Sequence, residues 1–228
     1  MLLKKIVNNL NRKDRFLSLA GLILFIFGIA ASGLIFLREH GVVTPVRGGF
    51  YREGIIGQPI SVNPVTAASE ADSDLAAVLF SSLKNLASSI ETKKDNRTYN
   101  VKIFENLKWS DGKPLTADDI VFTVKIIQNP KSASSLYKNW AGVSVERISE
   151  LQVQFILPNS YAFFDGNLDK LRIIPKHIFE NIPPENFALS SFNLKPVTSG
   201  PYAIKKIEKR KDGFITQYHL EINKKYHK

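Results

Sequence analysis

Two pairs of acidic residues are the first candidates for chemistry, because two neighbouring carboxylates can act as general acid and general base. The pairs are Asp118 with Asp119 and Asp72 with Asp74. Consecutive residues on a helix point about 100° apart, and carboxylates in the first turn stabilise a helix through its dipole. We therefore interpret both pairs as helix starts rather than as acid–base sites.

His177 is a further candidate base, and it follows Pro175 and Lys176 at an expected helix start. We interpret it as a half-exposed packing residue. The chain has no cysteine and only four histidines, which are scattered, so thiolate and histidine-built metal sites are not expected. It also lacks the P-loop, G-x-G-x-x-G, G-x-S-x-G and H-E-x-x-H patterns. We therefore predict a protein that is not an enzyme and that holds no cofactor or metal.

Basic side chains are grouped at residues 205–211, next to an Asp212-Gly213 turn signal, and a solvated hairpin tip explains them. The whole chain has 31 basic and 21 acidic residues, a net charge of +10. Five of the basic residues precede residue 16, so the remainder is only mildly basic. This balance gives no reason to expect nucleic acid as a partner.

Residues 16–37 form an apolar segment of 22 residues without a charge. A helix of about 20 such residues crosses a hydrocarbon core. The basic residues of segment 1–15 predict a cytoplasmic N-terminus and an exported body. We favour an uncleaved signal anchor, because the apolar run continues past the small residues 30–33 where a signal peptide would be cleaved. Cleavage is the alternative. A polar linker, 38–47, then leads to the body, 48–228.

Apolar residues make up 44% of the chain and charged residues 23%, which is typical of a globular protein. Alternation of apolar and polar residues predicts strands at 99–103, 151–157 and 214–222. The Asp212-Gly213 turn should pair the last strand with residues 202–208. The body is therefore expected to contain antiparallel hairpins.

Helical spacing of apolar residues predicts three helices in the body. The first covers 72–86, and its inward residues are Leu75, Val78, Leu79 and Leu83. The second begins after Thr116, which can cap it, and ends at Asn129-Pro130. The third begins near Pro175. Strands and helices together indicate an α/β fold.

Four segments, taken in order, carry a family resemblance. They are 57–64 (GQPISVNP), 106–122 (NLKWSDGKPLTADDIVF), 174–177 (IPKH) and 196–202 (PVTSGPY), the last followed by Asn223 and Tyr226. This set resembles the oligopeptide/dipeptide-binding family of extracellular solute-binding proteins, family 5, which are the capture subunits of ABC importers. The resemblance covers residues 48–228. It implies the first lobe of a class II periplasmic-binding-protein-like fold, with an inserted subdomain, preceded here by one transmembrane helix.

The departures from the family affect the expected function. Family members are considerably longer, so the resemblance implies that the second lobe is absent and that this chain is a partial binder. Gln58 and Asn63 stand where the family usually has acids. Closure of two lobes is what desolvates and holds a ligand in such proteins, so a single lobe should bind weakly.

The resemblance implies the substrate-binding component of a peptide ABC importer, held at the cell membrane by one helix with its body on the extracytoplasmic side. Its partners would be peptides and the importer's permease, although some family members carry nickel or sugars. Residues 66–69 resemble the family's ligand-edge segment, and two aromatic residues are candidate walls for which core packing is the other interpretation. The expected ligand-binding residues are Thr66, Ala67, Ala68, Ser69, Trp140 and Tyr161. The alternative function is a surface-anchored module that binds a protein partner and takes no part in transport.

Overall fold

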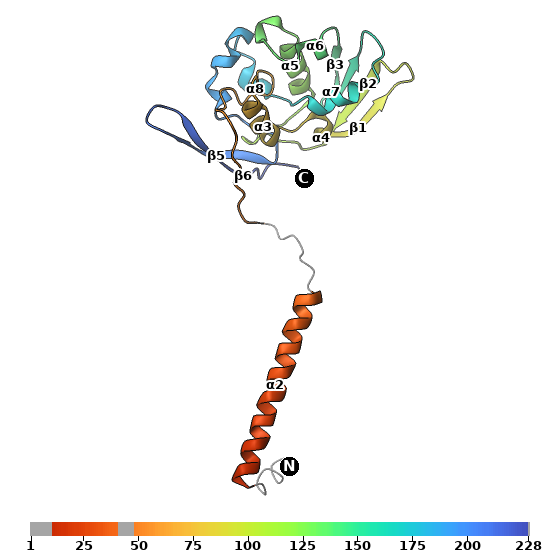
Figure 1. The fold of residues 1–228 in the computed structure, drawn as a ribbon. Helices are drawn as coiled ribbons and strands as arrows, with labels where there is room; N and C mark the ends of the chain where they lie inside the picture. The colour runs from red at the N-terminus through yellow and green to blue at the C-terminus, as the bar shows by residue number, and fades with distance from the viewer. Residues whose placement is uncertain (1–10, 41–47, 228) are drawn as a thin grey trace. The chain divides into compact units, whose positions relative to one another are not determined.

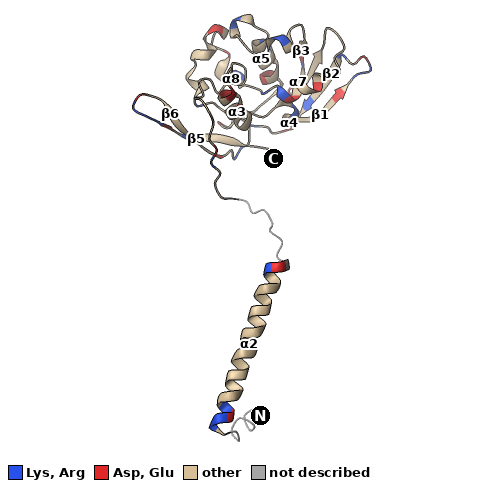
Figure 2. Cartoon of the chain, in the orientation of Figure 1, with Lys and Arg blue, Asp and Glu red and all other residues tan. Residues whose placement is uncertain are grey.

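The computed structural model describes residues 11–40 and 48–227, which belong to two units, Met1–Glu53 and Gly54–Lys228 (Figure 1). The described part of the first unit has one helix of 29 residues, α2 (Arg12–His40), which includes the predicted apolar segment. Charged residues lie only at its two ends (Figure 2). The helix is long and apolar enough to cross a membrane, a property that it shares with signal sequences. The choice between an anchor and a cleaved signal therefore stays a prediction.

The second unit mixes helices and strands, in agreement with the predicted α/β class. Its elements are α3 (Glu70–Leu79), α4 (Leu83–Leu86), β1 (Ala87–Thr92), β2 (Thr98–Ile103), α5 (Ala117–Ile127), η1 (Pro130–Ser132), α6 (Tyr137–Trp140), β3 (Ser144–Ser149), β4 (Gln152–Ile156), α7 (Phe164–Lys170), α8 (Lys176–Phe179), η2 (Pro184–Leu189), η3 (Ser191–Asn193), β5 (Tyr202–Lys209) and β6 (Ile215–Ile222).

Four of the strands form an antiparallel sheet in the order β1-β2-β4-β3. The predicted alternation sets its buried face, because Val101 lies opposite Val153 and Tyr99 opposite Phe155. Helix α5 packs on this sheet along β3 and β4. The buried apolar residues of the described part form one core, which includes the inner faces of α5 and of this sheet.

Strands β5 and β6 form a separate two-stranded sheet, joined by the predicted turn (Figure 1). Gly213 in that turn has a φ of +86°, a conformation that glycine adopts without strain. The hairpin is tied to the rest of the unit near its base, where Gly200 N donates to Leu79 O at 2.8 Å. A Cβ at residue 200 would lie 2.6 Å from the carbonyl carbon of Leu79. This close approach explains the glycine.

The predicted helix over 72–86 is wrong in its second half. Helix α3 ends at Leu79, and Phe80 is extended with φ −124° and ψ 131°. Ser81 then bonds to Ser199 through both its backbone N–H and its hydroxyl. This long-range pairing replaces the helical bonds, and the chain resumes as the short α4. Val78, expected inward, is 37% exposed.

The third predicted helix is short. Pro175 is the cap before α8 rather than its first helical residue, and α8 has only four residues.

Candidate functional site

Two helix starts organise the conspicuous sequence segments of the second unit. The start of α5 joins residues 106–122 to residues 174–177 and 196–202. The start of α3 holds the predicted ligand-edge segment, Thr66–Ser69. Each helix has a buried aspartate at its third position, Asp119 and Asp72 respectively.

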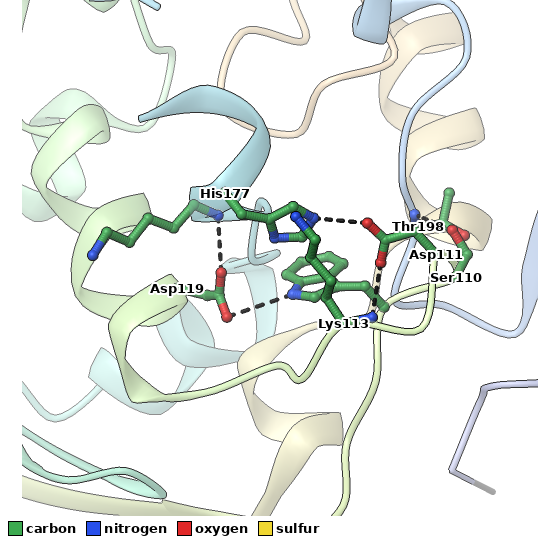
Figure 3. A network of polar contacts seen from close by, with 8 residues as sticks. Ser110, Asp111, Lys113, Asp119, His177 and Thr198 are labelled. Atoms are coloured by element: carbon green, nitrogen blue, oxygen red, sulfur yellow. Dashed lines mark hydrogen bonds and ion pairs between the residues drawn. The ribbon is translucent and has the colours of Figure 1, made fainter. Parts of the chain in front are cut away.

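Asp119 is the centre of the first arrangement (Figure 3). Its Oδ2 accepts hydrogen bonds from Thr116 N at 2.9 Å and from Trp109 Nε1 at 3.4 Å. Its Oδ1 accepts one from Lys176 N at 2.8 Å, at the start of α8. Asp119 is 4% exposed, and this burial raises its pKa although the hydrogen bonds oppose the shift.

Asp118, the neighbour of Asp119, points elsewhere. Its carboxylate is about half exposed and lies 3.2 Å from Arg147 Nε. The two aspartates therefore do not converge on one substrate atom, and both oxygens of Asp119 are already occupied by N–H donors. This geometry confirms the helix-start interpretation of the pair.

Two further contacts complete the first arrangement (Figure 3). His177 Nε2 lies 2.8 Å from Asp111 Oδ2 in the turn before α5, and the histidine side chain is 18% exposed. Ser110 N donates to Thr198 O at 2.8 Å, and Thr198 N donates to Ser110 Oγ at 3.0 Å. Three of the four segments that carry the family resemblance thus hold one another in place, so these contacts support the fold.

Asp72 is the centre of the second arrangement, and it is 2% exposed. Its Oδ1 accepts from the backbone N–H groups of Ile60 and Ser61 at 2.7 and 2.8 Å. Its Oδ2 accepts from Ser69 Oγ at 2.7 Å, and Ser69 Oγ in turn accepts from Asp72 N at 3.0 Å. One carboxylate therefore fixes both ends of the loop that carries the ligand-edge segment. Sequence reasoning predicted only the helix-start part of this role.

Asn63 holds the middle of the same loop. Its carbonyl accepts from Thr66 N and Ala67 N at 3.0 and 2.7 Å, and its side chain bonds to that of Asn193 at 3.3 Å. Both asparagines are 1% exposed. Asn193 was not predicted to matter. The one sequence signal for this contact was that Asn63 stands where the family usually has an acidic residue.

The ligand-edge segment presents backbone at its tip. Ala68 is exposed, and within residues 48–227 neither its N–H nor its carbonyl takes part in a hydrogen bond. Thr66, Ala67 and Ser69 are partly buried. Nearby, burial and the negative charge of Asp72 raise the pKa of Tyr218 to about 12. Its hydroxyl is buried and has no hydrogen-bond partner among the described residues.

The two aromatic candidates, Trp140 and Tyr161, differ in their exposure to solvent. Trp140 is 1% exposed and packs against Phe155 and Phe164, with ring centroids 5.6 and 5.4 Å away. This placement follows the core-packing interpretation. Tyr161 is 47% exposed and lies edge-on to Phe163. Whether any of the six predicted residues binds ligand stays a prediction.

The described residues contain no group of three His, Cys, Asp or Glu side chains that could hold a metal ion. The arrangements above are hydrogen-bonded supports, and in the ligand-edge segment the exposed Ala68 has neither its N–H nor its carbonyl in a hydrogen bond within residues 48–227. Among residues 11–40 and 48–227, the predicted segment at 66–69 is therefore the best candidate site.

Comparison with known proteins agrees with this architecture. Residues 83–228 match the family described as bacterial extracellular solute-binding proteins, family 5. The oligopeptide-binding protein AppA of Bacillus subtilis is 34% identical over 179 residues, covering 71% of this chain and 32% of AppA. The chain spans between about a fifth and a third of the length of the curated relatives that it matches.

Solved structures show the same fold. The structure of Bacillus subtilis AppA in complex with a nonapeptide matches with a TM-score of 0.65 at 33% identity, over 75% of this chain and 36% of that one. Campylobacter jejuni NikZ in complex with Ni(L-His) matches with a TM-score of 0.63 at 30% identity, over 77% and 35%. The chain belongs to the bacterial extracellular solute-binding proteins of family 5.

Proposed function

We propose that this chain is the substrate-binding component of a peptide ABC importer, with its body on the extracytoplasmic side of the membrane and α2 as its anchor. The relatives support the choice of ligand, because they include an oligopeptide-binding protein and its nonapeptide complex. The apolar length of α2 supports the anchor. The permease is the partner that such a component requires.

The observation that carries the ligand class is the free backbone of Ala68. An extended peptide has an N–H and a carbonyl at every residue, and it can pair with exposed backbone groups of a protein in the manner of an added strand. The loop beneath Ala68 is fixed by Asp72 and Asn63, so ordering the loop costs little when a peptide binds. Small side chains at 67 and 68 leave room for different peptide side chains.

A backbone-directed NMR experiment tests this proposal. The full chain, labelled with ¹⁵N-alanine and held in nanodiscs, is titrated with peptides of three to nine residues. We expect the Ala67 and Ala68 amide signals to move, with a dissociation constant of the order of millimolar, since each solvent-exposed hydrogen bond contributes only about 0.5–1.5 kcal/mol. Peptides methylated on their backbone nitrogens should move these signals less.

A pair of variants at one residue isolates the backbone contribution. Ala68→Pro removes the N–H donor, whereas Ala68→Ser keeps it. We expect the proline variant to bind at least about fivefold more weakly, the ratio for one lost hydrogen bond of about 1 kcal/mol, and the serine variant to bind normally. Equal binding by both variants would reject Ala68 as the contact. No peptide effect at all, together with a stable complex with a protein partner, would favour the surface-anchored interaction module.

A further inference from the structure

The net positive charge of the second unit comes from its C-terminal segment. Residues 54–201 contain fifteen basic and fifteen acidic residues, so their net charge is zero. Residues 202–228 contain eight basic and three acidic residues, a net charge of +5. The unit is therefore neutral apart from the segment that forms β5, β6 and the residues after them.

The acids of this segment are all paired with some of its bases. Lys205 Nζ lies 3.9 Å from Glu221 Oε2, and Lys206 Nζ lies 2.8 Å from Glu208 Oε1. At the turn, an ion pair of 3.0 Å joins the Arg210 guanidinium and the Asp212 carboxylate. Each of these pairs is local to the hairpin, so no acid of the segment is left to neutralise its other bases.

Four lysines of the segment are exposed and, within residues 48–227, form no ion pair. They are Lys209, Lys211, Lys224 and Lys225. The first two lie at the hairpin tip, which extends away from the rest of the second unit (Figure 1). Uncompensated cations on a projecting element attract a polyanion rather than a neighbouring part of the same unit.

The tip also carries an aromatic ring. Phe214 is 40% exposed, and the guanidinium carbon of Arg210 lies 4.6 Å from the centre of its ring. Aromatic rings and basic side chains are enriched together at membrane interfaces, where the ring enters the headgroup layer and the cations meet phosphate. The combination favours a phospholipid surface over a dissolved ion.

The short connection between the helix and the second unit means that even weak affinity of these lysines for lipid is enough for membrane binding. Residues 41–53 span at most about 45 Å when fully extended. A patch tethered at this range has an effective concentration near the membrane of the order of millimolar. Each basic side chain near an anionic surface improves partitioning by about fivefold at low salt, so a few free lysines are enough.

From these observations we infer that the β5–β6 hairpin binds the anionic phospholipid headgroups of the membrane that holds α2. The inference rests on the proposed anchoring by α2. It assigns a role to the basic group at 205–211 beyond that of a solvated tip, and it is independent of the peptide site. The occupant is a membrane surface that contains phosphatidylglycerol or a lipid of equal charge.

Energy transfer in reconstituted vesicles tests the inference. Because the chain has no cysteine, Gln217→Cys introduces a single thiol on the exposed side of β6 for a fluorescent donor. The full chain is reconstituted into phosphatidylcholine vesicles, with or without roughly 30% phosphatidylglycerol, that carry an acceptor on their headgroups. We expect strong transfer only in the anionic vesicles, and its loss at roughly 0.5 M NaCl.

Two double variants with the same change in charge distinguish binding by the hairpin from a general effect of net charge. Lys209→Gln/Lys211→Gln should lower the ratio of bound to free hairpin at least about tenfold, whereas Lys93→Gln/Lys94→Gln, on the exposed turn between β1 and β2, should leave it unchanged. Equal transfer in neutral and anionic vesicles, or equal losses in both double variants, would overturn the inference. Full displacement by soluble polyphosphate at equal phosphate concentration would overturn the membrane as the occupant.

The same samples report separately on the anchor. If the anchor holds and the hairpin does not bind, the chain stays with both kinds of vesicle after a high-salt wash but transfer is equal in the two. If the anchor fails, the wash removes the chain from both kinds of vesicle, which overturns the anchoring and, with it, this inference.

Discussion

The starts of α3 and α5 use the same local device for different purposes. Each has a hydroxyl residue at the cap and a buried aspartate three residues later, at Ser69/Asp72 and Thr116/Asp119. Asp119 Oδ1 accepts from the backbone of Lys176 at the start of α8, and Asp119 Oδ2 also accepts from the indole N–H of the buried Trp109. Asp72 Oδ1 instead accepts from the backbone N–H groups of residues 60 and 61 in the preceding loop. A helix-start motif therefore identifies the helix but not the contacts made by the second carboxylate oxygen of its aspartate.

The largest effect is expected where α3 meets the base of the hairpin. In Gly200→Ala the new Cβ would lie 2.6 Å from a backbone carbon and 2.8 Å from two backbone oxygens, none of which can move freely. We expect a loss of about 3 kcal/mol of unfolding free energy, measured by urea denaturation. Gly166→Ala is the control, since open space surrounds Gly166 in α7. It should stabilise the protein by about 0.5–1 kcal/mol. A neutral Gly200→Ala would show that the two segments do not pack as described.

The scaffold aspartate comes next. Asp119→Ala leaves three donors without an acceptor, of which Trp109 Nε1 is buried, and an unsatisfied buried donor costs about 1–3 kcal/mol. We expect a global loss of about 2.5 kcal/mol in the same denaturation experiment. The control is Asp118→Ala, which removes only a half-exposed ion pair and should cost about 0.5 kcal/mol. Similar losses in both variants would contradict the special role of Asp119.

The loop aspartate should give a smaller and more local effect. In Asp72→Ala the amides of Ile60 and Ser61 lose their acceptor, but Ile60 is exposed, so water can replace the bond to its amide. We expect a loss of about 1.5 kcal/mol and faster hydrogen exchange confined to residues 60–69. Asp74→Ala, an exposed neighbour, should change neither quantity. Faster exchange in α5 as well would mean that the two helix starts are one cooperative network.

The smallest effect concerns pH. Because burial raises the pKa of Asp119, the folded state keeps its proton at pH values where the unfolded chain has already lost it. The contribution of Asp119 to stability is therefore full below the ordinary carboxyl pKa and declines as pH rises through the raised one. The difference in unfolding free energy between the wild type and Asp119→Asn should fall over that window, by at most about 1.4 kcal/mol per pH unit. A difference that grows with pH would contradict the cause given for the shift.

Local signals predicted local structure well. Thr116 with Asp119, the alternation in 99–103 and 151–157, and the Asp212-Gly213 turn all gave elements that the structure contains. The residue resemblance gave the family. Each of these elements is determined by residues within a few positions of one another, and at that range the spacing decides on which face of the helix or strand a side chain lies.

The failures share a different cause. The break of the predicted helix at Phe80 depends on Ser81 bonding to Ser199, which lies 118 positions away. The double role of Asp72 and the pairing of Asn63 with Asn193 are likewise partnerships between distant segments. Spacing along the chain carries no record of which distant groups will meet, so the support beneath the candidate site could not be predicted.

The bond between Ser81 and Ser199 has a consequence for the order of folding. Closing a loop of 118 positions costs chain entropy before the contact stabilises the fold, so this contact is expected to form late. It cannot form until residue 199 has been synthesised. The α3–α4 junction therefore lacks this partner until then. We expect premature chain termination before residue 199 to leave a product that proteases digest readily at this junction.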